Sequence, residues 1–534
     1  MEYDFVIVGA GSAGCLLANR LSESGKHTVL VLEAGGPVND LQIHIPGAYG
    51  NLFKKKTDWG FWTEEQKHIN NRKIYLPRGK VLGGCSSINA MTYVRGNRSD
   101  YDGWASLGNK EWDYDYVLPY FKRTEKCKVD DTDARYRGQH GELQVILNKF
   151  HTPFSTAFID SCLQYGLPLN KDYNGESQLG VGQFQFTIKN GERHSALEAF
   201  LKPAMIRTNV DVVTGARVTR LILEGKQVTG VEYSKGKETM VVRASKEIVL
   251  SAGAFQSPQI LLLSGIGNPD DLDPHRISCL HELNGVGRNL QDHLFFSISG
   301  LAKEQLGLNH VLKPINKIKA LIQYFLQKRG PLTIGPLESV AFISTTNQNP
   351  DLELHFIPLH VGEGYDYDAY NLSTFPRTDG FTILPTLLKP KSRGKVTLRS
   401  SNPLDSPQIQ PNFLSEAEDL QILLKGAKIA LKIIRQSAFE PYLEKIIAPL
   451  SYQNDQEIIE HIKKSIETVY HPVGTCKMGN DDMAVVDDRL RVHGLKGLRV
   501  VDASIMPEIV SGNTNAPVYM IAEKAADMIL ADNK

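Results

Sequence analysis

Residues 4–33 constrain the fold more than any other part of the chain, because their pattern predicts a strand, a helix and a second strand. Gly9, Gly11 and Gly14 form G-x-G-x-x-G between the first strand and the helix, and Glu33 ends the second strand. Glycines so placed let backbone N–H groups and the helix N-terminus approach a pyrophosphate, and the carboxylate can bond ribose hydroxyls. The pattern predicts a Rossmann-like α/β domain that binds a dinucleotide.

Residues 10–14, AlaGlySerAlaGly, also resemble the nucleophile elbow of a serine hydrolase. An elbow follows several strands, including the one that supplies the oxyanion loop. Only eight residues precede Gly9, so we exclude this interpretation.

Further glycine-rich stretches at 78–91 and 250–254 bear on which dinucleotide is bound. With a late strand that ends in Asp502, they could wrap a cofactor larger than NAD through extended backbone contacts. This favours FAD, although the same stretches could be ordinary tight turns.

Composition narrows the class of protein. A chain of 534 residues predicts two or three domains, and 60 basic against 60 acidic residues give no surface for nucleic acid. The six cysteines include no C-x-x-C pair, which argues against a zinc site and fits a reducing compartment. A strand at residues 6–8 leaves no room for a cleaved signal, and no apolar run reaches the roughly 18 residues that span a bilayer. We therefore expect no metal and a cytoplasmic location, with the cytoplasmic face of the membrane as an alternative.

The order of predicted elements divides the chain into five segments. Residues 1–150 form the first part of an FAD-binding domain, with a lid or wrapping loop at 35–72, and residues 206–300 and 463–534 form its second and third parts. Residues 151–205 and 301–462 belong to a substrate domain, whose separate strands and strong helix near 415–436 predict an α+β fold with a mostly antiparallel sheet. A single strand is expected at 210–223.

Residues 308–332 are basic and amphipathic, and no acidic residue stands between Glu304 and Glu338. The favoured interpretation is a helix with an apolar face on the core and a solvated basic face. The alternative is a peripheral membrane contact.

Two late tracts carry candidate chemistry: HisProValGlyThrCysLysMetGly, headed by His471, and SerGlyAsnThrAsnAlaPro, which ends at Pro517. A lone histidine in an apolar stretch is more often a core residue than a catalyst. Asp292 and His293 form a competing titratable pair, which we interpret as scaffold near the cofactor in preference to a catalytic role.

Seven tracts in order resemble the glucose–methanol–choline (GMC) oxidoreductases, which use FAD, and among them the bacterial choline-dehydrogenase and alcohol-dehydrogenase branch. They are ValGlyAlaGlySerAlaGly with LeuGluAlaGlyGly, GlyLysValLeuGlyGlyCysSerSerIleAsn, the tract at 251–267, GlyValGlyArgAsnLeuGlnAspHis, the tract at 471–479, ValValAspAlaSerIleMetPro and GlyAsnThrAsnAlaPro. The resemblance spans essentially the whole chain.

The resemblance implies a catalytic site at His471, with Asn515 as the second active-site residue. The implied FAD-binding residues are Gly9, Gly11, Ser12, Ala13, Gly14, Glu33, Ala34, Arg78, Gly83, Gly84, Asn89, Met91, Val218, Ala252, Asp502, Ala503, Asn515 and Pro517. Where some family oxidases carry a histidine bonded to FAD, this chain has Ile88, which predicts non-covalent FAD. Ala90 lacks a hydroxyl that some choline-oxidising relatives carry, and no early residue cluster marks a trimethylammonium cage, so choline is not the default substrate.

The expected reaction is oxidation of a primary alcohol to an aldehyde. His471 would act as the base for the hydroxyl proton, because the ordinary pKa of histidine lies near neutrality, with hydride transfer to flavin N5. Asn515 would orient the alcohol oxygen, and Pro517 begins a helix whose positive end would stabilise charge on the reduced flavin. A lyase or decarboxylase on the same scaffold, a choline dehydrogenase and an NAD-linked dehydrogenase are the alternatives. The electron acceptor (dioxygen or a quinone) and the oligomeric state stay open.

Overall fold

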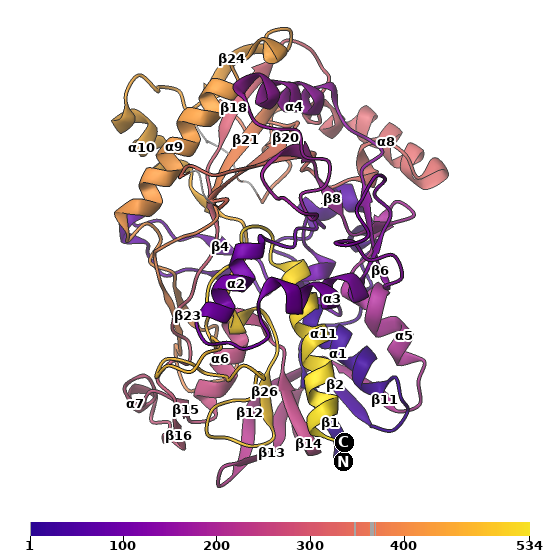
Figure 1. The fold of residues 1–534 in the computed structure, drawn as a ribbon, viewed down its shortest axis with the longest axis vertical. Coiled ribbons are helices and arrows are strands. Elements are labelled where there is room, and N and C mark those ends of the chain that lie inside the picture. The colour runs from indigo at the N-terminus through magenta and orange to yellow at the C-terminus, as the bar shows by residue number, and fades with distance from the viewer. Residues whose placement is uncertain (1, 347–348, 364–367, 369) are drawn as a thin grey trace.

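A computed structural model of the chain describes residues 2–346, 349–363, 368 and 370–534. It contains two large β-sheets at opposite ends of the molecule, each covered by helices (Figure 1). The principal helices are α1 (Ser12–Ser22), α2 (Arg98–Ser106), α3 (Tyr114–Thr124), α4 (Pro153–Tyr165), α5 (Lys202–Met205), α6 (Gly253–Leu263), α7 (Pro269–Leu272), α8 (Pro314–Gln327), α9 (Ala417–Ile433), α10 (Asp455–Ser465) and α11 (Asn515–Asp532).

The first sheet contains the predicted dinucleotide-binding unit. Its order is β11 (Val210–Thr214), β2 (Val29–Glu33), β1 (Glu2–Val8), β14 (Glu238–Leu250), β13 (Gln227–Lys235) and β12 (Ala216–Glu224), with β26 (Leu498–Val500) also paired to β14. The pairs β11–β2, β2–β1, β1–β14 and β14–β26 are parallel, whereas β12, β13 and β14 form an antiparallel meander. Strands of a parallel sheet are buried on both faces, and the apolar runs of β1 and β2 satisfy this requirement.

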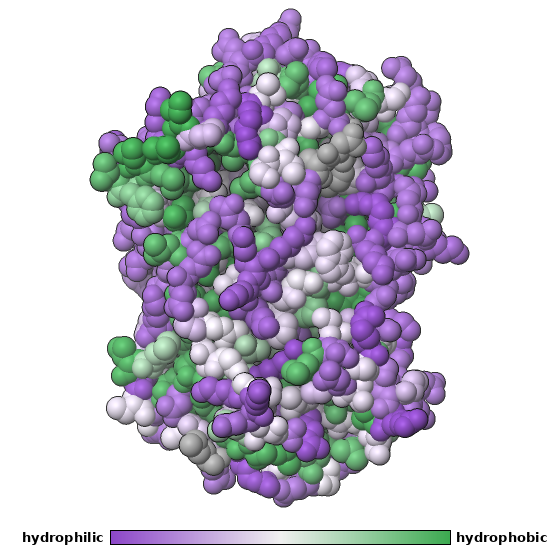
Figure 2. Space-filling model, turned by 180° about the vertical axis from the view of Figure 1, so that it is seen from behind, coloured by the Kyte–Doolittle hydropathy of each residue, from purple (hydrophilic) through white to green (hydrophobic). Residues whose placement is uncertain are grey.

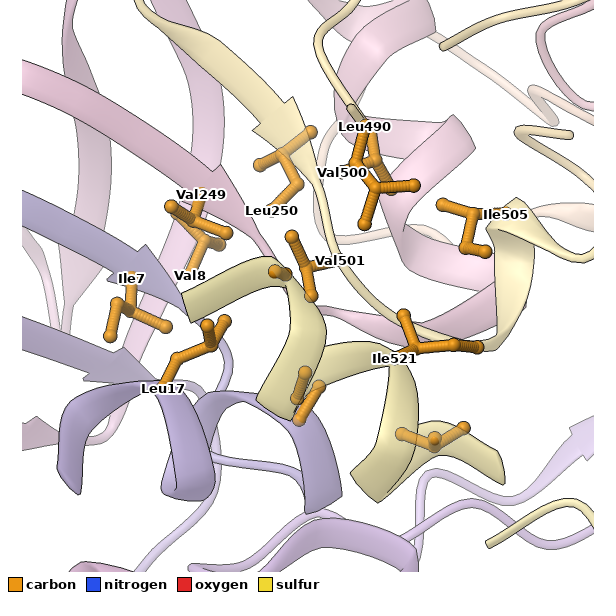
Figure 3. Close-up of a cluster of buried hydrophobic side chains, with 14 of the residues drawn as sticks. Ile7, Val8, Leu17, Val249, Leu250, Leu490, Val500, Val501, Ile505 and Ile521 are labelled. Carbon is orange, nitrogen blue, oxygen red and sulfur yellow. The ribbon is translucent and has the colours of Figure 1, made fainter. Parts of the chain in front are cut away.

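The first and last helices of the chain pack side by side against this sheet (Figure 1). Figure 3 shows Ile7 of β1, Leu17 of α1, Val500 of β26 and Ile521 of α11 in one buried cluster. Arg20 also donates from Nε to the fully buried Glu523 at 2.7 Å, which joins α1 to α11. The N-terminal and C-terminal segments are therefore parts of one domain.

The single strand expected at 210–223 is two strands. Gly215 has φ +67° and separates β11 from β12. Because a left-handed residue turns the chain, β11 pairs in parallel with β2 while β12 pairs antiparallel with β13. The pattern of apolar residues indicated strand on both sides of the glycine but did not show the change of partner.

The second sheet is antiparallel in every pairing among the described residues. Its order is β24 (Leu443–Ala448), β18 (Ile298–Ala302), β21 (Gly380–Leu387), β20 (Leu352–Ile357), β19 (Ser339–Ile343) and β7 (Gly180–Gln183), with β17 (Leu294–Phe295) joining β21 to β25 (Glu467–Thr468). Helices α4 and α9 pack on it through one hydrophobic cluster. The predicted fold class, an α/β FAD-type domain with an antiparallel second sheet, is confirmed. Strands β17 and β18 lie in this sheet, although the 206–300 segment was expected in the first domain.

The orientation expected for the amphipathic segment 308–332 is wrong. Helix α8 buries Ala320 and Tyr324, while the large apolar residues Ile318, Ile322 and Phe325 are exposed. The apolar face therefore points away from the protein core. Among the helices of the described chain, none is long and apolar enough to cross a membrane.

A buried carboxylate connects α4 to the second sheet. Glu338, which precedes β19, accepts hydrogen bonds at Oε2 from the backbone N–H and the hydroxyl of Thr152, both at 2.9 Å. Within the described part of the chain, Oε1 has no hydrogen-bond partner. Burial raises the pKa of Glu338 from 4.5 to about 7. As the pH rises, the glutamate ionises in the unfolded chain at a lower pH than in the folded protein. The stability contributed by this group therefore falls as the pH rises from 4.5 to about 7.

We expect Glu338→Gln to increase the free energy of unfolding by roughly 1–3 kcal/mol at pH 8, and to change it little at pH 5. The amide removes a charge that the folded protein must otherwise bury at pH 8. Thermal unfolding at both pH values measures the difference, with the exposed Glu304→Gln as control. Equal destabilisation at both pH values would contradict the pKa that we assign to Glu338.

Candidate active site

A cavity of ≈ 370 Å³ lies between the two sheets. On one side it is lined by Val8, Glu33 and Ser251, at the carboxyl ends of β1, β2 and β14. Its other side is lined by residues of the second sheet, including His355 and Thr382. Ligands of open α/β sheets bind outside the carboxyl ends of the strands, so the cavity has the position expected for a cofactor and a substrate together.

The glycines at the first end of the cavity bring backbone segments into close contact. Gly9 has φ +102° and Gly84 has φ +53°. A Cβ on Gly84 would lie 2.7 Å from Cα of Gly11, so the two glycine-rich segments touch only because neither has a side chain there. Backbone N–H groups and the N-terminus of α1 are thereby left facing the cavity, as a pyrophosphate requires.

Glu33 is held by the backbone of the same turn. Its carboxylate accepts hydrogen bonds from the N–H of Ala10 at 2.8 Å and of Gly35 at 2.7 Å. Burial raises the pKa of Glu33 to about 7. The carboxylate is fixed at the edge of the cavity, where it can accept hydrogen bonds from ribose hydroxyls.

Most of the predicted cofactor residues line this cavity. They are Gly9, Gly11, Ser12, Ala13, Glu33, Ala34, Arg78, Gly84, Asn89, Val218, Ala252, Asp502, Ala503 and Asn515. These strand ends, glycine cradles and helix N-termini fit a dinucleotide of the predicted kind.

Four predicted cofactor residues do not line the cavity. Gly14 packs against β1, where a Cβ would lie 1.9 Å from the carbonyl oxygen of Gly9. Gly83 has φ +88° and Met91 belongs to a buried cluster with Phe184 and Phe186. Pro517 is buried in the first turn of α11. Their positions follow from the shape of the backbone and the packing of the core, and their contact with FAD stays a prediction.

His471 lies half-buried at the junction of the two ends of the cavity. Asp292 accepts a hydrogen bond from its backbone N–H at 2.8 Å, and Thr468 bonds the second oxygen of Asp292. The imidazole Nε2 is 3.1 Å from Nδ2 of Asn513, and Nδ1 is 3.0 Å from Nδ1 of His293. Three polar side chains therefore fix the position of this histidine.

The hydrogen bonds around His293 determine which nitrogen of His471 carries the proton. His293 Nε2 lies 3.1 Å from the carbonyl oxygen of Leu388, which can only accept, so Nε2 of His293 carries a hydrogen. The neutral ring then accepts at Nδ1, and His471 must donate from its own Nδ1. We infer that Nε2 of His471 is unprotonated, as a base requires, and that its lone pair accepts from Nδ2 of Asn513 at 3.1 Å.

Burial also keeps both histidines neutral. It is the largest cause that lowers the pKa of His471 well below its ordinary value, and neighbouring His293, His355 and Arg78 act in the same direction. Burial lowers the pKa of His293 to about 3. Asp292, in contrast, has its pKa raised to about 6 by burial. An unprotonated His471 is therefore the resting form at neutral pH.

The assignment of Asn515 as the partner of His471 is wrong in this structure. Asn515 begins α11 and accepts a hydrogen bond at Oδ1 from the Ser12 hydroxyl at 2.6 Å, which joins the N-termini of α11 and α1. Asn513, two residues earlier, is the amide that contacts His471. Both asparagines line the cavity, but Asn515 lies with the predicted cofactor residues and Asn513 contacts His471.

Other cavity residues have little signal in the sequence. Tyr49 and Phe53, from the segment predicted as a lid, line the cavity beside Tyr470. The ring centroid of Phe53 lies 5.7 Å from that of Tyr49 and 6.0 Å from that of Tyr470. This early aromatic cluster was not expected. His293 was expected to be scaffold, and its direct contact with His471 makes it a positioning residue.

Together these features, a dinucleotide site beside a neutral histidine, are those of a dinucleotide-dependent oxidoreductase. Models of the GMC oxidoreductase family match residues 3–295 and 390–522. The chain belongs to this family, as its seven tracts predicted. It is an FAD-dependent oxidoreductase that acts on CH–OH donors.

Similar proteins span nearly the same length. The chain is 40% identical to "Alcohol dehydrogenase [acceptor]" of Pseudomonas putida over 99% of this chain and 96% of that protein. It is 42% identical to "Choline dehydrogenase, mitochondrial" of Homo sapiens over 99% of this chain and 90% of that protein. Among solved structures, pyridoxine 4-oxidase from Mesorbium loti superposes with a TM-score of 0.89 at 33% identity over 98% of both chains. A structure of formate oxidase superposes with a TM-score of 0.91 at 28% identity, over 99% of this chain and 98% of that chain.

Proposed function

We propose that the enzyme oxidises an uncharged primary alcohol to an aldehyde, with Nε2 of His471 as the base. The observation that carries this proposal is the hydrogen-bond series from Leu388 through His293, which leaves Nε2 unprotonated and facing the cavity. A base within hydrogen-bond reach is required because an alcohol hydroxyl is a poor acid.

Asn513 would complete the binding of the alcohol oxygen. Its Nδ2 lies 3.1 Å from Nε2 of His471, so one oxygen atom can lie within reach of both. The alcohol hydroxyl would replace the hydrogen bond between Nδ2 and Nε2, donating to Nε2 and accepting from Nδ2. His471 would then take the proton as the C–H bond breaks. The amide stabilises the negative charge that develops on the oxygen. Bound FAD supplies the hydride acceptor at its N5 atom.

The substrate end of the cavity favours an apolar alcohol over a sugar. It is lined mainly by apolar side chains: Phe295, Leu337, Ile357, Leu359, Val361, Phe375 and Leu384. Among the described residues, the carboxylates that line the cavity are Glu33 and Asp502. Both already accept backbone hydrogen bonds at the cofactor end. A sugar would leave several hydroxyl groups against apolar walls.

Choline is a second candidate, because aromatic faces attract quaternary ammonium ions. Tyr49, Phe53 and Tyr470 line the cavity together. The protein already directs a cation to this cluster, since Lys54 Nζ lies 5.1 Å from the ring centroid of Tyr370, whose ring neighbours both Phe53 and Tyr470. Lys54 is paired with Asp368 at 3.2 Å, so its charge does not decide between the two substrates. We favour the uncharged alcohol because the substrate end of the cavity is mainly apolar and its two carboxylates lie at the cofactor end.

We also propose that FAD is bound non-covalently, because Ile88 occupies the place at which some family oxidases carry a histidine bonded to FAD. This residue lines the cavity and has an alkyl side chain that cannot form such a bond. Denaturation of the purified yellow protein should therefore release FAD.

Anaerobic mixing with a panel of alcohols tests the proposed function. Linear and benzylic primary alcohols should bleach the flavin band lastingly, choline should bleach it more weakly, and a sugar should leave it unchanged. Failure of every alcohol to bleach the band would contradict the proposal and would favour a lyase. Air admitted after bleaching identifies the acceptor: rapid return of the band indicates dioxygen, and return only with an added quinone indicates a dehydrogenase.

The positioning role of His293 makes its own prediction. His293→Ala should slow flavin reduction about tenfold, because His471 loses one of the two hydrogen bonds that fix its tautomer. His293→Asn should recover much of the rate, since an asparagine oxygen can accept from Nδ1 of His471. Stopped-flow reduction of both variants measures this. Equal rates in the two variants would contradict a role through the tautomer.

A further inference from the structure

Helix α8 presents its apolar face to the outside of the molecule. Ile315, Ile318, Ile322, Phe325 and Leu326 are between 54% and 79% exposed. They recur at the spacing of one helix face, opposite the buried Ala320 and Tyr324. Figure 2 shows a hydrophobic patch at the upper left, where α8 lies when the molecule is seen from behind. A contiguous patch of this kind marks a surface that binds something.

The apolar face is not needed to attach α8 to the rest of the protein. Tyr324 packs with Ile45, Ala48 and Leu332 in a buried cluster. Lys328, which ends the helix with φ +50°, has Nζ 4.3 Å from the ring centroid of Tyr324 and donates to Glu192 at 2.8 Å. The helix is anchored by its other side, so its apolar face is free for an external partner.

The charge around this face is positive. Lys317 and Lys319 are exposed on the helix, and Lys313 and Arg329 flank it. No acidic residue occurs between Glu304 and Glu338. A second copy of the chain, related by a twofold axis, would place these lysines against one another. An anionic lipid surface offers both the opposite charge and an apolar interior.

We propose that α8 is a peripheral membrane contact that lies in the surface of an anionic bilayer. Ile318, Ile322 and Phe325 would enter the boundary of the acyl chains, while Lys317 and Lys319 would face lipid phosphates. The cluster under α8 includes Ala48, which is part of the 3₁₀ helix η2 (Pro46–Asn51), and Tyr49 of that helix lines the cavity. The docking helix thus rests on a wall of the substrate cavity.

Sedimentation with vesicles tests this contact on the full-length FAD-loaded enzyme. Wild type should bind vesicles of phosphatidylcholine with phosphatidylglycerol and bind phosphatidylcholine alone at least tenfold more weakly. The triple variant Ile318→Ser, Ile322→Ser, Phe325→Ser should lose most of the binding. The pair Lys317→Gln, Lys319→Gln should weaken it about 10- to 30-fold.

A matched control replaces three exposed apolar residues elsewhere, Leu107, Ile206 and Leu450, by serine. This control should bind as wild type does. FAD content and unfolding temperature verify that the variants fold, and the lysine pair keeps the test valid if the triple variant does not. Absence of wild-type binding to anionic vesicles, or equal binding by the triple variant, would overturn the proposal. A lipid-free dimer that the triple variant abolishes, without vesicle binding, would assign the face to a second copy. None of these outcomes depends on alcohol oxidation.

Discussion

Replacing His471 by alanine should slow reduction of bound FAD by an alcohol about 10²- to 10⁴-fold, the range by which a positioned general base accelerates proton transfer. The variant should still bind FAD, because His471 bonds Asn513 and His293 rather than the glycine turns that form the dinucleotide site. Single-turnover mixing without oxygen measures the reduction rate, and the visible spectrum before mixing measures FAD content.

The control for this variant is His493→Ala, a partly buried histidine whose Nε2 is 2.9 Å from the carbonyl oxygen of Gly479. It should retain the wild-type rate. Added imidazole should restore part of the rate to His471→Ala by supplying a base in the vacated space. Loss of FAD from His471→Ala, with a normal rate in the fraction that retains it, would show that the histidine is structural.

Asn513 and Asn515 should give opposite phenotypes although they are two residues apart. Asn513→Ala should keep FAD and reduce its flavin 10- to 100-fold more slowly, because a hydrogen bond to a developing charge is lost. Asn515→Ala breaks the bond from the Ser12 hydroxyl that joins two helix N-termini at the cavity. We expect it to weaken FAD binding about tenfold, with a near-normal reduction rate once FAD saturates the site.

Each asparagine variant is the control for the other. FAD titration of the apoprotein gives the binding constant, and anaerobic mixing gives the reduction rate. A slow rate in Asn515→Ala with FAD fully bound, beside a normal rate in Asn513→Ala, would restore Asn515 as the partner of the base.

The dinucleotide end of the site could be predicted from the sequence because its determinants are local. Gly9, Gly11 and Glu33 occupy fixed places in one strand–helix–strand unit, and that unit folds in only one way. The partners of His471 could not be predicted in the same way. Asn513 and Asn515 occur in one short tract, and only the position at which α11 begins decides which of them faces the base.

Two other features depend on tertiary contacts that cannot be predicted from the pattern of apolar residues in the sequence. His293 meets His471 across 178 positions of sequence. Helix α8 was expected with its apolar face on the core. The periodicity of an amphipathic helix is the same whether its apolar face is buried or exposed. The two buried residues, Ala320 and Tyr324, are outnumbered by the five large apolar residues of the exposed face, so the pattern alone favoured the wrong face.

The central claim is that an unprotonated His471 takes the proton of the alcohol, and the pH dependence of anaerobic flavin reduction tests it most directly. Burial lowers the pKa of His471 well below 6.5. Protonation of His471 should therefore slow flavin reduction only when the pH falls through that lowered pKa. Wild type should keep its full reduction rate from pH 8 through pH 6.5, and His471→Ala should be slow throughout. A wild-type rate that falls to half near pH 6.5, or a rate unaffected by His471→Ala, would contradict the account.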